Sequence, residues 1–162
     1  MREIVTLIAV ASFSAAAGEP LSADVTLSLI KDKGPRAAVE TIWNTEAWEQ
    51  LRLGVASGAP AWLKVAKEIR PGTDAGSTSE LSDVVAWALP KAPEGVLALV
   101  ANDQASWEVV CSSPPVDEPP EGLENYYRRA IAAVRNVKRK SLQRIRAICL
   151  PQLEAAAKRS RQ

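Results

Sequence analysis

Apolar residues recur at helical spacing along almost the whole chain. The stretch from Trp62 to Ile69, for example, places apolar side chains at positions i, i+3, i+4 and i+7, which lie on one face of an α-helix. No segment shows the sustained two-residue alternation that a half-buried strand requires. The pattern therefore predicts an all-α protein, a compact array of about six to eight helices joined by short loops into helical hairpins.

Prolines and capping residues mark where these helices begin. Pro35, Pro60 and Pro93 each precede an apolar face, and proline is tolerated in a first helical turn because its missing N–H would be unpaired there anyway. Ser77 and Glu80 have the S-x-x-E spacing of a capping box, in which two side chains satisfy exposed backbone N–H groups. We therefore expect Ser77 to cap a helix, and this is the best-supported helix start in the chain.

Ala-Trp pairs recur along the sequence, at Ala47-Trp48, Ala61-Trp62 and Ala86-Trp87. The first and third pairs are spaced close to the HEAT-like period of about 40 residues, whereas Pro60 and Pro93 do not match that period. Degenerate HEAT-like repeats therefore stay open as one arrangement of the array.

The first segment, residues 1–17, has the organisation of a secretory signal peptide. Arg2 precedes an apolar run that ends in Ala15-Ala16-Ala17, a small-residue site of the kind that signal peptidase cleaves. The run is shorter than the roughly 20 residues of a membrane span. Glu3 weakens the positive start, and a buried N-terminal helix is the alternative. We expect a mature chain with no membrane span, located in the periplasm or secreted.

The mature chain divides by composition into a body, a connector and an arm. We expect residues 18–111 to form a multi-helix body and residues 123–162 a basic C-terminal helical arm, the two making one domain. Residues 112–122 between them contain adjacent prolines and several acids, which favours an extended, solvated connector. Within the arm we predict one long helix from Leu123 to Leu150, which Pro151 kinks or restarts before a frayed tail.

Charge is distributed unevenly between these parts. Gly18 to Gly122 carries 16 acidic and 8 basic residues, net −8, whereas Leu123 to Gln162 carries 2 acidic and 11 basic residues, net +9. Such an asymmetry is typical of chains with an anionic partner. The interpretation we favour is that the arm lies on the acidic body and neutralises it. The candidate partner surface on the arm consists of Arg135, Lys138, Arg139, Lys140 and Arg144.

Cys111 and Cys149 are the two cysteines of the chain. In an exported protein two cysteines usually pair, because the compartment outside the inner membrane is oxidising. Closing a loop between residues 38 positions apart, as these are, stabilises a fold by roughly 4 kcal/mol. A redox-active pair is the alternative, but the C-x-x-C spacing of such pairs is absent. We therefore predict a structural disulfide that ties the long C-terminal helix to the body.

The composition excludes several kinds of chemistry. Histidine is absent, which excludes Ser–His–Asp and Cys–His mechanisms and the usual histidine-containing zinc sites. Carboxylates are frequent, but no spacing singles out a pair suited to bond cleavage, so a hydrolase is the least favoured class. We expect no enzyme activity, no cofactor and no metal site.

The polar loop from Arg70 to Gly76 is a candidate ligand site, with Arg70, Thr73 and Asp74 as its candidate residues. Polar loops held by rigid helices often carry function. The alternative is that Arg70 and Asp74 pair with each other or cap the next helix. The loop lacks the lysine and the spacing of a phosphate-binding P-loop.

The tryptophans offer a second kind of candidate surface, since exposed aromatic side chains supply binding area. Trp43, Trp48, Trp62 and Trp87 lie on the same helical faces as aliphatic residues, so we expect them to pack in the core. Trp107 has polar neighbours in the sequence, and it is the tryptophan that we expect to be partly exposed.

Three stretches make the chain resemble small exported proteins of proteobacteria whose role is uncharacterised: Gly34–Val39, Ala61–Leu63 and Arg70–Gly76. The resemblance implies a periplasmic location and supplies no catalytic residue. We expect a non-enzymatic helical protein that binds an unknown protein partner in an inhibitor-like, immunity-like or scaffold role. The alternative is an envelope-associated factor that binds anionic lipid or glycan through its basic C-terminal helix. Nucleic acid is not an expected partner of an exported chain.

Overall fold

The computed structural model describes residues 21–103, 107, 109–112, 119 and 121–161. All regular secondary structure in these ranges is helical, which confirms the predicted all-α class. The predicted signal peptide, residues 1–17, lies outside the described residues. The helices are α1 (Ala23–Lys33), α2 (Pro35–Ile42), α3 (Glu46–Ala56), α4 (Pro60–Ile69), α5 (Ala75–Ala88), α6 (Pro93–Asn102), α7 (Val109–Ser112), α8 (Leu123–Arg135) and α9 (Gln143–Arg159), with 3₁₀ helices η1 (Arg70–Gly72) and η2 (Lys140–Leu142).

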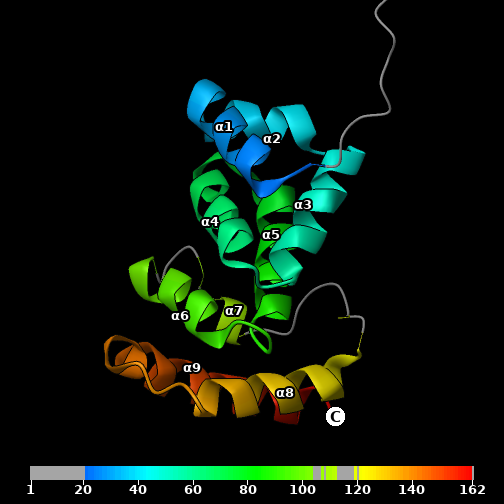
Figure 1. Ribbon diagram of the computed structural model, residues 1–162. Helices are drawn as coiled ribbons and strands as arrows, with labels where there is room; N and C mark the ends of the chain where they lie inside the picture. Colours follow the sequence, from blue (N-terminus) through cyan, green and yellow to red (C-terminus); the bar gives the residue numbers. More distant parts are fainter. Residues whose placement is uncertain (1–20, 104–106, 108, 113–118, 120, 162) are drawn as a thin grey trace, which may run out of the picture.

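The helices are arranged in three tiers (Figure 1). Helices α1 to α5 form a bundle at one end, in which α3 packs on α5 and α1 packs on α2 and α4. Helices α6 and α7 lie beneath this bundle and connect it to an antiparallel pair, α8 and α9, at the other end. The core runs through all three tiers, because each helix buries one apolar face against its neighbours.

The helix starts predicted from proline are confirmed. Pro35, Pro60 and Pro93 each occupy the first turn of their helices, α2, α4 and α6. The capping box was predicted one turn too late, since α5 begins at Ala75 with Asp74 as its N-cap. The Ser77 backbone N–H donates to the Asp74 carboxylate at 3.1 Å, and the Asp74 N–H donates to the Ser77 hydroxyl at 2.9 Å. Ser77 is therefore the third residue of α5 and not its cap.

The predicted single helix from Leu123 to Leu150 is wrong. The chain leaves α8 at Asn136, passes through η2 and reverses into α9. Val137 and Leu142, on either side of the reversal, are both buried. A straight helix of that length would span about 42 Å at 1.5 Å per residue, and its far half would leave the body. Reversal lets both halves bury their apolar stripes against each other and against α6.

Of the two expected effects of Pro151, a kink or a restart, the helix shows no restart, since α9 continues through the proline to Arg159. Proline inside a helix removes one backbone hydrogen bond. Leu153, Ala156 and Ala157 are nevertheless buried beyond it, and Arg159 donates to the Ser112 carbonyl of α7 at 2.9 Å. Tertiary packing therefore offsets the local cost, and the predicted frayed tail is helical over most of its length.

Of the four tryptophans expected in the core, one is buried there and three are partly buried against it. Trp48 is buried, and Trp43, Trp62 and Trp87 are half-buried and pack against the core. Trp107, which was expected to be partly exposed, is only 2% exposed. The Arg70 guanidinium lies 4.5 Å from the centre of its ring, so the polar neighbours in the sequence did not report its tertiary environment.

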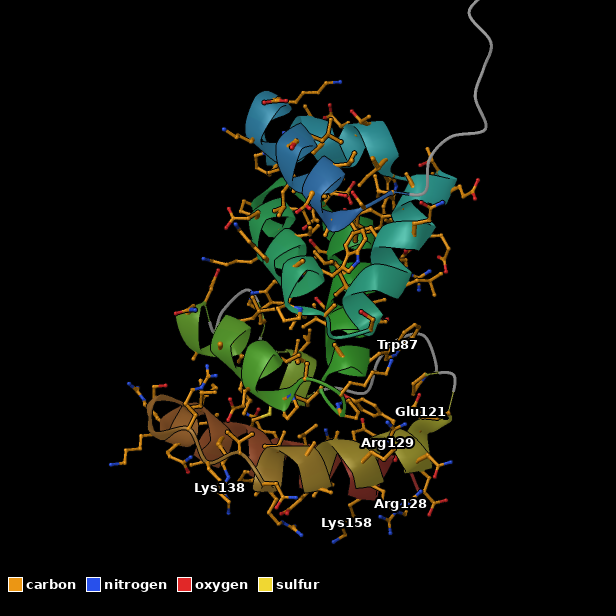
Figure 2. The ribbon with its side chains drawn as sticks, in the orientation of Figure 1. Trp87, Glu121, Arg128, Arg129, Lys138 and Lys158 are labelled. Carbon is orange, nitrogen blue, oxygen red and sulfur yellow. A yellow bond between two sulfur atoms is a disulfide. The ribbon has the colours of Figure 1, made fainter. Side chains whose placement is uncertain are left out.

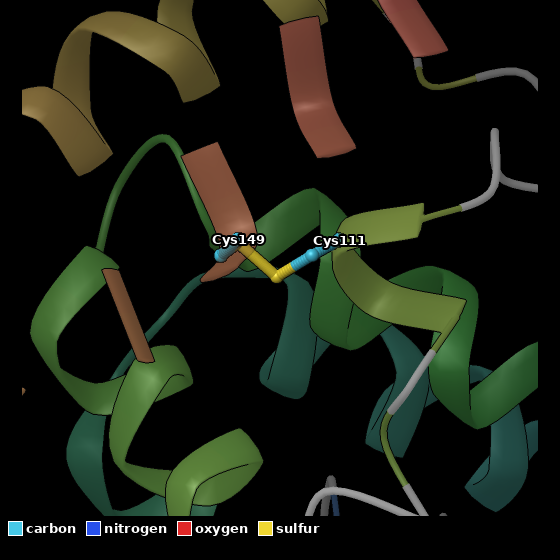
Figure 3. The surroundings of a disulfide bond; sticks show 2 residues. All are labelled: Cys111 and Cys149. Atoms are coloured by element: carbon cyan, nitrogen blue, oxygen red, sulfur yellow. A yellow bond between two sulfur atoms is a disulfide. The ribbon is translucent and has the colours of Figure 1, made fainter. Parts of the chain in front are cut away.

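The predicted disulfide between Cys111 and Cys149 is confirmed (Figure 3). It joins α7 to α9, with 5.1 Å between the two Cα atoms. Of the helices in the described ranges, none has the length and apolar character needed to cross a bilayer.

Candidate functional site

The candidate ligand loop is drawn into internal contacts by Arg70. Its guanidinium donates to the Thr78 carbonyl at 2.9 Å and to the Ser82 hydroxyl at 2.8 Å, both on α5. Burial lowers the pKa of Arg70 below its ordinary value, and the Asp103 carboxylate partly opposes that shift. Together with its position over the Trp107 ring, these contacts make Arg70 a structural link between η1, α5 and the end of α6.

Thr73 and Asp74 have comparable internal partners. The Thr73 hydroxyl donates to the Arg70 carbonyl at 2.8 Å and lies 2.6 Å from the Thr78 hydroxyl. Hydrogen bonds from Ser77 hold the pKa of the Asp74 carboxyl below its ordinary value. The structure thus brings the three predicted residues together, and Arg70 and Thr73 border an open pocket of about 520 Å³. Asp74 caps a helix, as the alternative interpretation of the loop expected.

The candidate partner surface lies where α8 turns into α9. Arg135 pairs with Glu154 of α9 at 2.8 Å, and Arg139 pairs with Glu94 of α6 at 2.9 Å. Lys138, Lys140 and Arg144 are exposed, and no acidic side chain in the described ranges pairs with them.

Further cations extend this surface along both helices. Figure 2 shows Arg128, Lys138 and Lys158 on the side of α8 and α9 that faces away from the rest of the protein. Lys158 is not among the residues predicted for this surface, because the tail beyond Pro151 was expected to fray. We define the basic surface as seven of the exposed cations of this tier: Arg128, Arg135, Lys138, Arg139, Lys140, Arg144 and Lys158.

Apolar packing, more than charge, holds the arm to the body. The described ion pairs that leave the arm join Arg139 to Glu94 and Arg129 to Glu121, at 2.9 and 3.2 Å. Both are solvent-accessible, and such pairs contribute about 0–1 kcal/mol each. The arm also buries a row of apolar side chains that are at most 5% exposed: Ala130, Val134, Ile145 and Leu153. The charge neutralisation favoured from the sequence is therefore limited, in the described ranges, to a few peripheral contacts.

A second surface feature, which was not predicted, is an apolar recess between α3 and the end of α5. It has a volume of about 290 Å³ and is lined by Glu49, Arg52, Leu53, Ala56, Ser57, Trp87, Lys91 and Glu121. Leu53 is 63% exposed, because it stands out of phase with the stripe that α3 buries. The position of Leu53 outside the buried stripe of α3 was the one signal of this recess in the sequence. Trp87 and Glu121 are labelled in Figure 2, on the same side of the molecule as Arg128 and Arg129.

The charged side chains around this recess are ordered by short contacts. Arg52 pairs with Glu49 at 3.1 Å and with Glu80 at 3.6 Å, and it lies 5.9 Å from the centre of the Trp87 ring. The Lys91 ammonium donates to the Ala56 carbonyl at 2.7 Å. The buried indole N–H of Trp87 finds no acceptor among the described residues. The recess therefore combines an apolar lining with a rim of both charges, Glu49, Arg52, Lys91 and Glu121.

Comparison with protein-family models, with curated proteins and with solved structures finds no match of this chain in any of the three.

Proposed function

We propose that this chain is a non-enzymatic, exported helical protein that binds another protein through its basic surface, in an inhibitor-like, immunity-like or scaffold role. The observation that carries the proposal is the set of exposed cations at the α8–α9 reversal without acidic partners in the described ranges: Lys138, Lys140 and Arg144. A surface of one sign attracts a partner of the opposite sign and accelerates encounter. The partner's contact surface is accordingly acidic.

The connection that presents Lys138 and Lys140, with Arg144 in the first turn of α9 beside it, is held in place by polar and apolar contacts. The Gln143 side chain donates to the carbonyls of Val137 and Arg139, at 3.2 and 3.0 Å. Val137 and Leu142 are buried beneath the loop. Because little backbone freedom remains to be lost, binding at this loop carries a small ordering cost. This preorganised connection favours a role in recognition, because a turn that is only solvated does not need a fixed conformation.

The disulfide supports the exported location of the proposal. Disulfides form and persist in oxidising compartments and are rare in the cytosol. The signal-peptide pattern of residues 1–17 agrees with this location.

Charge reversal tests the proposal. We expect wild-type protein to recover an acidic protein from envelope extract, and the triple variant Lys138→Glu/Lys140→Glu/Arg144→Glu to lose that protein. A matched control carries the same charge change on α1 and α4, as Lys31→Glu/Lys33→Glu/Lys64→Glu, and should behave as wild type. Recovery of no protein, or equal recovery by the triple variant, would argue against the proposal.

The second candidate is an envelope-associated factor that binds anionic lipid or glycan on the same surface. It is favoured by the way cations of α8, α9 and their connection converge on one face directed away from the body. Near an anionic membrane each lysine or arginine contributes about 1 kcal/mol. This candidate expects salt-sensitive sedimentation with anionic vesicles, which zwitterionic vesicles do not produce and Lys138→Glu/Arg139→Glu/Lys140→Glu abolishes. Sedimentation that survives this substitution would eliminate it.

A further inference from the structure

We infer that the apolar recess between α3 and α5 is a second binding site, which takes one apolar side chain of a protein segment together with a neighbouring carboxylate. The inference rests on the proposed function in one respect, that the occupant is a protein. It concerns different residues from the basic surface, and it is tested with different variants.

The lining determines the apolar part of the occupant. Leu53 exposes most of its side chain at the recess, and Ala56 and the half-buried Trp87 ring lie beside it. Aromatic and aliphatic side chains around a small hollow are typical of the anchor pockets that dominate protein interfaces. The volume of about 290 Å³ lies at the lower limit of ligand pockets, which measure about 300–1,000 Å³. The recess is therefore suited to one side chain and is small for a cofactor.

The charges on the rim determine the polar part of the occupant. The carboxylate of Glu49 pairs with Arg52, and that of Glu121 pairs with Arg129 at 3.2 Å. Lys91 is exposed, and no carboxylate in the described ranges pairs with it. Its ammonium has three N–H donors and uses one on the Ala56 carbonyl. A carboxylate next to the apolar anchor would complete this rim, because the other charges already have partners.

The paired charges of the rim support the same polarity. Glu121 lines the recess and pairs with Arg129 of α8, and Glu49 pairs with Arg52. The Lys91 ammonium is therefore the rim charge left for an occupant, and it favours an acidic segment over a basic one. The alternative occupant of an exposed apolar recess, a second copy of this chain, is one of the outcomes of the test.

The experiment selects random peptides displayed on phage against the mature, disulfide-bonded chain. We expect the enriched peptides to contain a large apolar residue with an aspartate or glutamate close to it. Fluorescence anisotropy with one labelled synthetic peptide then measures the dissociation constant. Leu53→Ser should weaken binding about tenfold, since it removes the most exposed apolar side chain of the lining. Lys91→Glu should weaken binding of the acidic peptide by a similar factor. The same variant should bind more tightly to a peptide that has lysine in place of the acid.

Matched controls separate the recess from general surface effects. Val25→Ser changes an exposed apolar residue on α1, 57% exposed, and Lys138→Glu makes the same charge change on the basic surface. Both should leave peptide affinity within about twofold of wild type. Circular dichroism spectra should be unchanged in every variant, because Leu53 and Lys91 are exposed.

The inference is overturned if no peptide is enriched, if enriched peptides lack acids, or if affinity survives Leu53→Ser or Lys91→Glu. It is also overturned if sedimentation velocity shows a dimer that Leu53→Ser dissociates, since a second copy then occupies the recess. Loss of the envelope partner in the charge-reversal triple variant, with peptide affinity retained, would instead show that the two surfaces act separately.

Discussion

Removing the Cys111–Cys149 disulfide should strongly destabilise the protein, although it leaves the apolar residues of the core unchanged. The bond closes a loop between residues 38 positions apart, and the chain-entropy relation gives about 4 kcal/mol for a loop of that length at 25 °C. Domains of this size have a free energy of unfolding of about 5–15 kcal/mol. The loss is therefore a large share of the total, and it should lower the melting temperature by roughly 10–20 °C.

The measurement compares oxidised wild type, reduced wild type and Cys111→Ala/Cys149→Ala by urea denaturation. Reduction isolates the loop-closure contribution, because the sulfur atoms stay in place. The alanine variant should lose somewhat more, since a cavity of about 250 Å³ already borders the disulfide beside Val100 and Ile145 and a smaller side chain enlarges the void. The slope of unfolding free energy against urea should increase without the bond, because the denatured chain becomes less compact.

Reductant should have no effect on the alanine variant, which serves as the control for effects on the rest of the protein. If oxidised and reduced wild type differ by less than about 1 kcal/mol, then loop closure is not what the bond contributes. Apolar packing between α7 and α9 would then be sufficient to hold the arm.

Gly54→Ala should destabilise the protein by about 1–3 kcal/mol in urea, because a Cβ there would lie 2.3 Å from an indole ring of α4. Its matched control Gly76→Ala meets no atom closer than 3.5 Å and should be neutral or stabilising by up to about 1 kcal/mol. Asp74→Asn should reduce the loss of stability at acid pH. The measurement is the fall in melting temperature as the pH is lowered. The lowered pKa of Asp74 means that its carboxylate stabilises the fold above the ordinary value of 3.8 and stops doing so as pH falls through the lower folded-state pKa. A double-mutant cycle on Arg139 and Glu94 should give a coupling of less than about 1 kcal/mol, because both side chains are exposed; a larger coupling would restore the electrostatic clamp as the force that holds the arm.

Features with a local physical cause were predictable from the sequence. Proline sets φ near the helical value wherever it stands, so Pro35, Pro60 and Pro93 located three helix starts. The pairing of Cys111 with Cys149 followed from composition, because two cysteines allow a single intramolecular connection.

Features that depend on which faces meet were not predictable in the same way. The turn between α8 and α9 contains no proline or glycine, and the apolar stripe on its two sides reads as one helix. Trp107 belongs to the core cluster, and Arg70, far from it in the sequence, lies over its ring. Ser77 is the third residue of α5 because Asp74, three residues earlier, also has a side chain that can cap a helix and is the N-cap.

By itself, the sequence determined the helical class, three helix starts, the covalent link and the separation of acidic body from basic arm. Only the tertiary structure decided that the arm folds back on itself, so that Arg128 and Lys158 share one face. It also decided that Leu53 and Trp87 form a recess. The physical reason is that periodicity records which side of each helix avoids water, whereas the partner of that side is chosen by packing among all helices together.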